Sequence, residues 1–174
     1  VTSRHLTTNK NILVGTLGKG GKGLYALDVT DPANAAGSTL FQWERAETPL
    51  RNMGLVMGRP LLAGVNGTAS VIVGNGINSA RGRAVLLVLN AETGAVVREI
   101  DTGAGAEDQP NGLSAPVGVY GPDGKTLRYA YAGDMLGNVW KFDLTSTSAS
   151  AWSATKLFTA TDRTGNAQPI SAAL

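Results

Sequence analysis

Apolar residues in this chain come in short runs, and one type of run occurs three times. Each copy is mainly apolar, closes with Asp or Asn and is followed by a turn: Leu24–Asp28, Leu86–Asn90 and Val139–Asp143. The closing residues lie 62 and then 53 positions apart. This period is too long for a solenoid rung and near that of a propeller blade, so the pattern predicts a repeat of whole supersecondary units.

The runs on either side of each copy repeat as well. An apolar run ending in Gly precedes each copy, at Ile12–Gly15, Val71–Gly74 and Tyr129–Gly133, and a third run follows it, at Leu40–Trp43, Val96–Ile100 and Lys156–Phe158. The second and third units also open with a run after proline, Pro60–Val65 and Pro116–Tyr120. Four short strands joined by tight turns make one β-propeller blade. No stretch of a dozen residues keeps helical spacing without a Gly or Pro, so we predict an all-β fold.

The residues between the runs are typical of hairpins. Asn66-Gly67 and Asp123-Gly124 separate the first and second strands and supply the positive φ of a tight turn. Asp28, Asn90 and Asp143 close the third strands, where such a side chain accepts a hydrogen bond from the backbone two residues on. We interpret these three residues as structural caps.

The 174 residues suffice for about three to three and a half blades, whereas a closed ring needs about four to eight. We predict blades at about 1–52, 53–108 and 109–166, with 167–174 as the opening strand of a further blade. The first blade lacks a clear opening strand, because Val1–Asn11 is mostly polar. We expect residues 1–174 to be part of one propeller domain whose remaining blades come from other segments of a longer protein. Made alone, the chain should associate through its terminal strands or be poorly soluble.

Composition narrows the possible partners. No apolar run approaches the roughly 18 residues of a membrane span. The 15 basic and 13 acidic residues are scattered, which predicts no nucleic-acid partner, since that would need a clustered basic face. The absence of Cys excludes disulfides and thiolate metal sites.

Four motifs, in this order, resemble the C-terminal β-propeller of the PilC/PilY type IV pilus biogenesis and tip adhesin family: Leu13–Pro32, Gly74–Ser79, Tyr131–Asp143 and Gln168–Ser171. The resemblance covers nearly the whole chain. It implies an extracytoplasmic protein at the pilus tip or outer-membrane surface that primes pilus assembly, opposes retraction and contributes to adhesion. The partners that it implies are minor pilins and host or abiotic surface ligands.

In many members of this family, the turn before the Tyr131–Asp134 motif resembles a calcium-binding EF-hand loop. Calcium needs about six to eight oxygen ligands. Residues 119–129 of this chain keep one carboxylate, Asp123, and have Lys125 and Arg128 where anions would be wanted. We therefore expect an ordinary Asp-Gly hairpin here and no calcium cofactor.

Other candidate sites have simpler explanations. Gly15–Gly23 looks like a phosphate loop, but neither Lys has the Walker spacing and a strand follows. His5 is the only imidazole, which excludes histidine triads within the chain. Glu107-Asp108 lies in a Gly/Ala-rich loop, and we interpret these two residues as part of the solvated surface. Among Trp43, Trp140 and Trp152, Trp140 lies in a repeated strand and is expected to pack between blades. We predict no catalytic, cofactor-binding or metal-binding residue and no enzyme activity.

Two other protein classes stay open. The run Tyr25–Asp28 also occurs in quinoprotein dehydrogenases, so the chain could be a fragment of a pyrroloquinoline-quinone enzyme, which would need its quinone, a calcium or lanthanide ion, a catalytic Asp and a full ring. It could also belong to a propeller scaffold of outer-membrane assembly. An N-terminal adhesive domain and a signal peptide in the full reading frame would identify the pilus protein.

Overall fold

A computed structural model describes residues 2–4, 10–34 and 36–174. Its strands form three four-stranded antiparallel sheets in which neighbours in sequence are neighbours in space. The first sheet contains β1 (Thr2–Arg4), β2 (Asn11–Thr16), β3 (Gly23–Asp28) and β4 (Phe41–Ala46). The second contains β5 (Leu61–Val65), β6 (Thr68–Gly74), β7 (Val85–Asn90) and β8 (Val96–Asp101). The third contains β9 (Val117–Tyr120), β10 (Leu127–Gly133), β11 (Asn138–Asp143) and β12 (Ser153–Thr159).

Helical structure is limited to short turns between strands. The only α-helix in the described residues is α1 (Gly37–Leu40), and the 3-10 turns are η1 (Gly18–Gly20), η2 (Pro32–Asn34) and η3 (Ala149–Ala151). The prediction of an all-β fold is therefore confirmed. We call the three sheets blade 1, blade 2 and blade 3.

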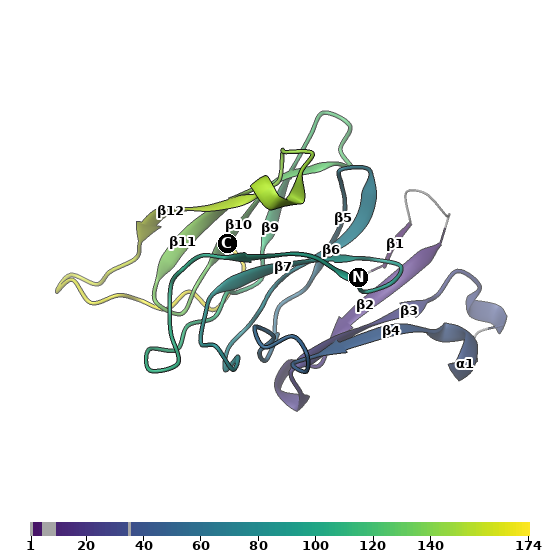
Figure 1. Cartoon of the computed structure of the whole chain (residues 1–174), viewed down its shortest axis with the longest axis horizontal. Coiled ribbons are helices and arrows are strands. Elements are labelled where there is room, and N and C mark those ends of the chain that lie inside the picture. Colours follow the sequence, from purple (N-terminus) through teal and green to yellow (C-terminus); the bar gives the residue numbers. More distant parts are fainter. Residues whose placement is uncertain (1, 5–9, 35) are drawn as a thin grey trace.

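The blades follow one another in the order of the sequence, with blade 2 between the other two (Figure 1). Because successive strand residues point to opposite faces, β6 and β7 contribute to two separate cores. Val71, Val73, Leu87 and Leu89 pack against blade 1, whereas Ile72, Leu86 and Val88 pack against blade 3. Burial on both faces explains why β6 and β7 are almost continuous apolar runs.

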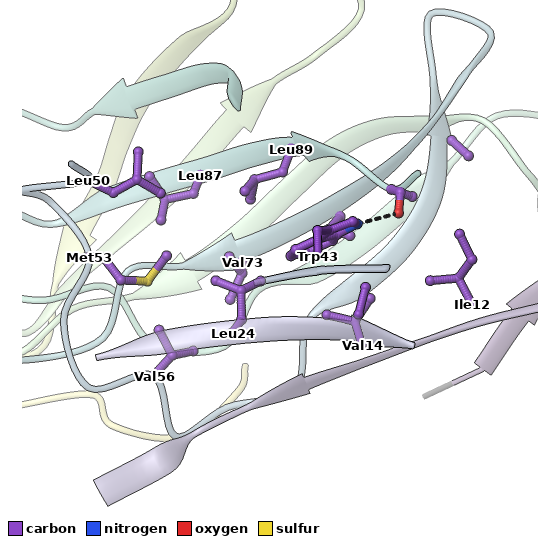
Figure 2. Packing of buried hydrophobic residues seen from close by; sticks show 14 of the residues in the cluster. Ile12, Val14, Leu24, Trp43, Leu50, Met53, Val56, Val73, Leu87 and Leu89 are labelled. Carbon is purple, nitrogen blue, oxygen red and sulfur yellow. Dashed lines mark hydrogen bonds between the residues drawn. The ribbon is translucent and has the colours of Figure 1, made fainter. Parts of the chain in front are cut away.

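Figure 2 shows the core between blades 1 and 2, with Trp43 among Val14 and Leu24 of blade 1 and Leu87 and Leu89 of blade 2. The Trp43 indole N–H donates to the carbonyl oxygen of Ala91 at 2.9 Å. Trp43 thus joins the two blades by packing and by a hydrogen bond.

Most of the predicted turn chemistry is present. Asn66 and Gly67 have φ values of 50° and 73°, as a tight hairpin requires. In the other predicted pair only Gly124 has a positive φ, of 65°, and Asp123 does not, so that loop is wider than a two-residue turn. The carboxyl or amide oxygens of Asp28, Asn90 and Asp143 accept backbone N–H groups two residues on, at 2.9–3.0 Å, which confirms their role as caps.

Blade 1 corrects two expectations from the sequence. It does have an opening strand, β1, paired antiparallel with β2. This strand has three residues and is defined by backbone pairing, so an apolar pattern could not reveal it. The ladder also pairs Thr16 with Leu24, just as it pairs Gly74 with Leu86 and Gly133 with Val139. Thr16, rather than Gly15, is therefore the counterpart of the two glycines, and a shift of one residue exchanges the faces of a strand.

Residues 167–174, predicted as the opening strand of a further blade, form no strand ladder with the described residues, and their assignment to a further blade stays a prediction. The backbone N–H of Ile170 donates to the carbonyl oxygen of Asp134 at 3.0 Å, and the Ile170 side chain lies over Gly133. Residues 113–114 lie over Gly74 of blade 2 in the same way. The segment around Ile170 thus has the same position relative to blade 3 that the linker at residues 113–114 has relative to blade 2.

Candidate functional site

The most highly connected polar group in the described residues is the carboxyl group of Asp134, which directly follows β10 and is fully buried. Its Oδ1 accepts the backbone N–H groups of Leu136 and Asn138 at 3.0 and 2.8 Å. Its Oδ2 accepts the side-chain N–H groups of Asn111, Asn138 and Trp140 at 3.0, 2.9 and 2.8 Å. Five donors on four residues therefore surround one buried carboxyl group.

Asn111 extends this network into the linker between blades 2 and 3. Its side-chain oxygen accepts the N–H groups of Gly112 and Leu136 at 2.8 and 3.2 Å. Asn138, at the start of β11, accepts the Thr159 hydroxyl of β12 at 2.7 Å. The network ties the linker, β11 and β12 to the end of β10.

Blade 2 has a neutral version of the same arrangement. Asn75 follows β6 as Asp134 follows β10, and its Oδ1 accepts the N–H groups of Val85 and Leu113, each at 3.0 Å. Its Nδ2 donates to the carbonyl oxygens of Asn52 and Arg83, each at 2.8 Å. Asn52 precedes Asn75 by 23 residues, and Asn111 precedes Asp134 by 23. We call Asn52–Asn75 and Asn111–Asp134 the polar pins of blades 2 and 3.

The polar pins are suited to holding blades together rather than to chemistry on a ligand. Asn52, Asn75, Asn111 and Asp134 are all at least nine-tenths buried. Both oxygens of Asp134 are used by donors of the chain itself. A buried polar group is tolerated when it is hydrogen-bonded in this way. Asn52 contributes to its pin through its backbone carbonyl, and its buried side-chain oxygen has no hydrogen-bond partner, so the pin of blade 3 is the more completely satisfied of the two.

The carboxyl group of Asp123 accepts hydrogen bonds from its own loop. Oδ1 of Asp123 accepts the N–H groups of Lys125 and Thr126 at 3.0 and 2.9 Å, and Oδ2 accepts the Thr126 hydroxyl at 2.5 Å. These hydrogen bonds, with the Thr126 hydroxyl first, lower the pKa of Asp123 to about 2. The loop is thus closed by its own donors, and the described residues contain no group of three or more His, Asp or Glu side chains that could hold a metal.

The other residues singled out from the sequence are dispersed. Glu107 and Asp108 are exposed in a loop, and Gly15–Gly23 contains η1 and leads directly into β3, as expected for a hairpin. Trp140 is buried in the core between blades 2 and 3, which confirms the packing role, and Trp152 donates to the Ser146 carbonyl at 2.9 Å. His5 lies outside the described residues.

Sequence reasoning missed the polar pins. From the sequence, Asp134 and Asn138 are only parts of the family motif Tyr131–Asp143, and Trp140 is a packing residue. The equal spacing of 23 residues in the two pairs is visible in the sequence. One member of each pair lies in a linker and the other follows a strand, and only the fold shows that these positions meet.

Comparison with known proteins identifies the family. A model of the PilY1 beta-propeller domain matches residues 2–173. The chain belongs to this family. A type IV pilus biogenesis factor PilY1 homolog of Xylella fastidiosa is 40% identical over 164 residues, which cover 94% of this chain and 12% of the relative. The type IV pilus biogenesis factor PilY1 of Pseudomonas aeruginosa strain PAO1 is 42% identical over 134 residues, covering 76% of this chain and 11% of the relative.

The fold of this PilY1-family chain is also that of a solved relative. The crystal structure of the Pseudomonas aeruginosa PilY1 C-terminal domain superposes with a TM-score of 0.89 at 35% identity. The match covers 99% of this chain and 39% of that chain. The three blades are therefore part of a PilY1-type propeller, and the chain spans about an eighth of the curated relatives. In the described residues we find no helix of the length and apolarity needed to cross a membrane.

Proposed function

We propose that this chain is a non-catalytic interaction module in the propeller of a type IV pilus biogenesis and adhesion protein. The match to the PilY1 beta-propeller domain over residues 2–173 carries the proposal. In the proposed role, the parent protein acts outside the cytoplasm, at the pilus tip or outer-membrane surface. It supports pilus assembly, opposes retraction and contributes to surface attachment.

The structure supports a binding role through the way in which its polar groups are used. The most highly connected carboxyl group, Asp134, is buried and bonded within the chain. The exposed acidic pair Glu107-Asp108 lies in a loop without a basic partner among the interactions of the described residues. Blades joined by buried pins form a rigid support on which exposed loops can contact minor pilins or surface ligands.

We also propose that this part of the propeller acts without calcium or another cofactor. The loop around Asp123 supports this proposal, because Lys125 and Thr126 donate to its only carboxyl group.

The role in piliation is tested in the bacterium that carries the protein. Deletion of the segment corresponding to residues 10–174 should reduce surface pili and attachment. If the module opposes retraction, the same deletion in a retraction-deficient background should restore pili without restoring attachment. Pili that stay absent in that background would limit the role to assembly, and normal pili and attachment in the deletion strain would contradict the proposal.

A matched variant separates a specific role from simple loss of the fold. Gly74→Ala should destabilise the domain, because the linker passes directly over Gly74, whereas Gly20→Ala should leave its stability unchanged. A strain with Gly20→Ala should therefore have normal pili, and a strain with Gly74→Ala should lose pili and attachment in proportion to the loss of folded protein.

A further inference from the structure

Two cationic side chains lie on facing surfaces where the outer strands of blades 2 and 3 meet. In β8, Arg98 pairs with Val88, which packs in the core between these blades, so Arg98 is on the face toward blade 3. In β12, Lys156 pairs with Trp140 of the same core, so Lys156 is on the face toward blade 2. The strands β8 and β12 contact each other directly. We call Arg98 and Lys156 the basic rim.

The ladder registers place the two cations at nearly the same level of the joint. Val88 and Lys141 hold the same register position in blades 2 and 3, and Lys141 directly follows Trp140. The ladder partners of Arg98 and Lys156 therefore differ in level by one residue.

The basic rim has no acidic partner in the part of the chain that the structure describes. No salt bridge of the described residues involves Arg98 or Lys156. The Nε atom of Arg98 is buried and has no hydrogen-bond partner. A buried donor without an acceptor destabilises the fold, and like charges on facing surfaces repel each other. The rim thus lacks an anion that would compensate both effects.

The joint between blades 1 and 2 has a carboxyl group at the equivalent place. Glu99 of β8 pairs with Leu87, which packs against blade 1. Leu87 and Trp140 hold the same register position in blades 2 and 3, so Glu99 is the counterpart of Lys156. The Glu99 carboxyl group accepts a hydrogen bond from the side chain of Asn52 in the linker. The repeat therefore has a carboxylate in one joint where it has an ammonium group in the other.

We propose that the basic rim binds the carboxylate of an Asp or Glu side chain of a partner protein. A guanidinium group can donate two parallel hydrogen bonds to a carboxylate, and the ammonium group adds a further charge-assisted contact. Arg98 is only partly buried and Lys156 is exposed, so an acidic side chain can approach from the outer rim of the propeller. The inference goes beyond the proposed role in piliation, and its test on isolated protein is independent of that role.

Nitrogen NMR of the arginine side chains tests the proposal at the atom that lacks an acceptor. The probe is the capped peptide acetyl-Asp-Glu-Asp-amide, with acetyl-Asn-Gln-Asn-amide as the neutral control, added to the 174-residue chain at low salt. The Nε–H signal of Arg98 should move saturably with the acidic peptide and stay in place with the neutral one. Lys156→Gln should weaken binding several-fold, because one of the two charge-assisted contacts is lost.

A second variant supplies the carboxylate from the chain itself. Lys156→Glu introduces the residue that blade 2 has at this position, so it should pair with Arg98 and abolish binding of the acidic peptide. The melting temperature should rise by about 2–4 °C, as expected for a modest gain in a domain of this size. Lys19→Glu makes the same change of charge at an exposed position in blade 1, and it should alter neither the melting temperature nor the peptide binding.

Three outcomes would overturn the inference. One is an Arg98 signal that does not move or that responds equally to both peptides, and another is a Lys156→Glu variant no more stable than the unmodified chain. The third is a response to polygalacturonate without a response to the acidic peptide, which would assign the rim to acidic polysaccharides. If the chain alone self-associates, the same measurements are made on the whole propeller domain of the parent protein.

Discussion

The indole N–H of Trp140 donates to Oδ2 of Asp134 at 2.8 Å, and both residues are buried. Trp140 packs in the core between blades 2 and 3, and Asp134 accepts a hydrogen bond from the side chain of Asn111 in the linker. The same pair of residues therefore fixes both the packing of blade 3 and the path of the chain into it.

Removal of the Asp134 carboxyl group should destabilise the protein strongly. Asp134→Ala leaves the buried side-chain donors of Asn111, Asn138 and Trp140 without this acceptor, and each such loss costs about 1–3 kcal/mol. We expect the free energy of unfolding to fall by about 3 kcal/mol or more, measured by urea denaturation. Asp108→Ala, at an exposed position, should change it by less than about 0.5 kcal/mol.

A double-mutant cycle measures how much of this loss of stability comes from the hydrogen bond between Trp140 and Asp134. Trp140→Phe keeps most of the ring but removes its N–H, so we expect a coupling energy with Asp134→Ala of about 1–2 kcal/mol. Additive losses would show that the hydrogen bond contributes nothing beyond packing.

Gly74 is required because the linker passes directly over it. A methyl group added there would lie 2.0 Å from the carbonyl oxygen of Ser114 and 2.7 Å from that of Leu113. Since these are backbone atoms, Gly74→Ala should displace the linker and destabilise the fold by about 1–3 kcal/mol or more in thermal denaturation. Gly20→Ala is the matched control, with no atom within 4 Å of the added group. Equal stability of the two variants would contradict the close approach.

Trp43 should control the attachment of blade 1. Trp43→Phe removes the hydrogen bond to Ala91 and should cost about 1 kcal/mol, whereas Trp43→Ala also empties the core and should cost about 3–5 kcal/mol. Hydrogen exchange should increase in β2 and β3 more than in β10 and β11. Uniform exchange across all three blades would instead indicate a single cooperative unit.

The carboxyl groups of Asp123 and Asp162 should both titrate at about pH 2. The Thr126 hydroxyl and backbone lower the pKa of Asp123, and the Thr164 hydroxyl with Asn166 lowers that of Asp162. Because both values lie below the ordinary 3.8, these loop contacts are fully stabilising above that pH and are lost as the pH falls through about 2. Carbon NMR of the carboxyl groups measures both values. Thr126→Val should raise the pKa of Asp123 and leave that of Asp162 unchanged.

Calcium should neither bind tightly to this chain nor stabilise it. In calorimetric titration we expect no saturable heat in the micromolar range, and thermal melting should be the same with calcium or with chelator. Micromolar affinity that Asp123→Ala abolishes would contradict the proposal of a calcium-independent loop.

The features that the sequence predicted best are those formed by residues close together in the chain. The caps Asp28, Asn90 and Asp143 and the turn Asn66-Gly67 were predictable, because an Asx cap and a left-handed turn involve only neighbouring residues. The strands of blades 2 and 3 were predictable as well, since burial requires apolar runs of strand length.

Strand β1 and the register of blade 1 were beyond such reasoning. A three-residue strand is defined by its backbone partner, and the register depends on which residues face each other across the ladder. The contact of Ile170 with Gly133 was equally beyond such reasoning, because it depends on how the C-terminal segment packs against β10.

By itself, the sequence determined the repeat, the all-β class and the family. The spacing of apolar residues, the turn residues and the order of the motifs are properties of the linear sequence and need no knowledge of the fold. Only the tertiary structure decided that Asn111 and Asp134 meet, that Trp43 bonds to Ala91 of the next blade and that Asp123 is satisfied by its own loop. These features depend on distances between residues of different strands, linkers and loops, and the packing of blades, rather than the order of residues, sets those distances.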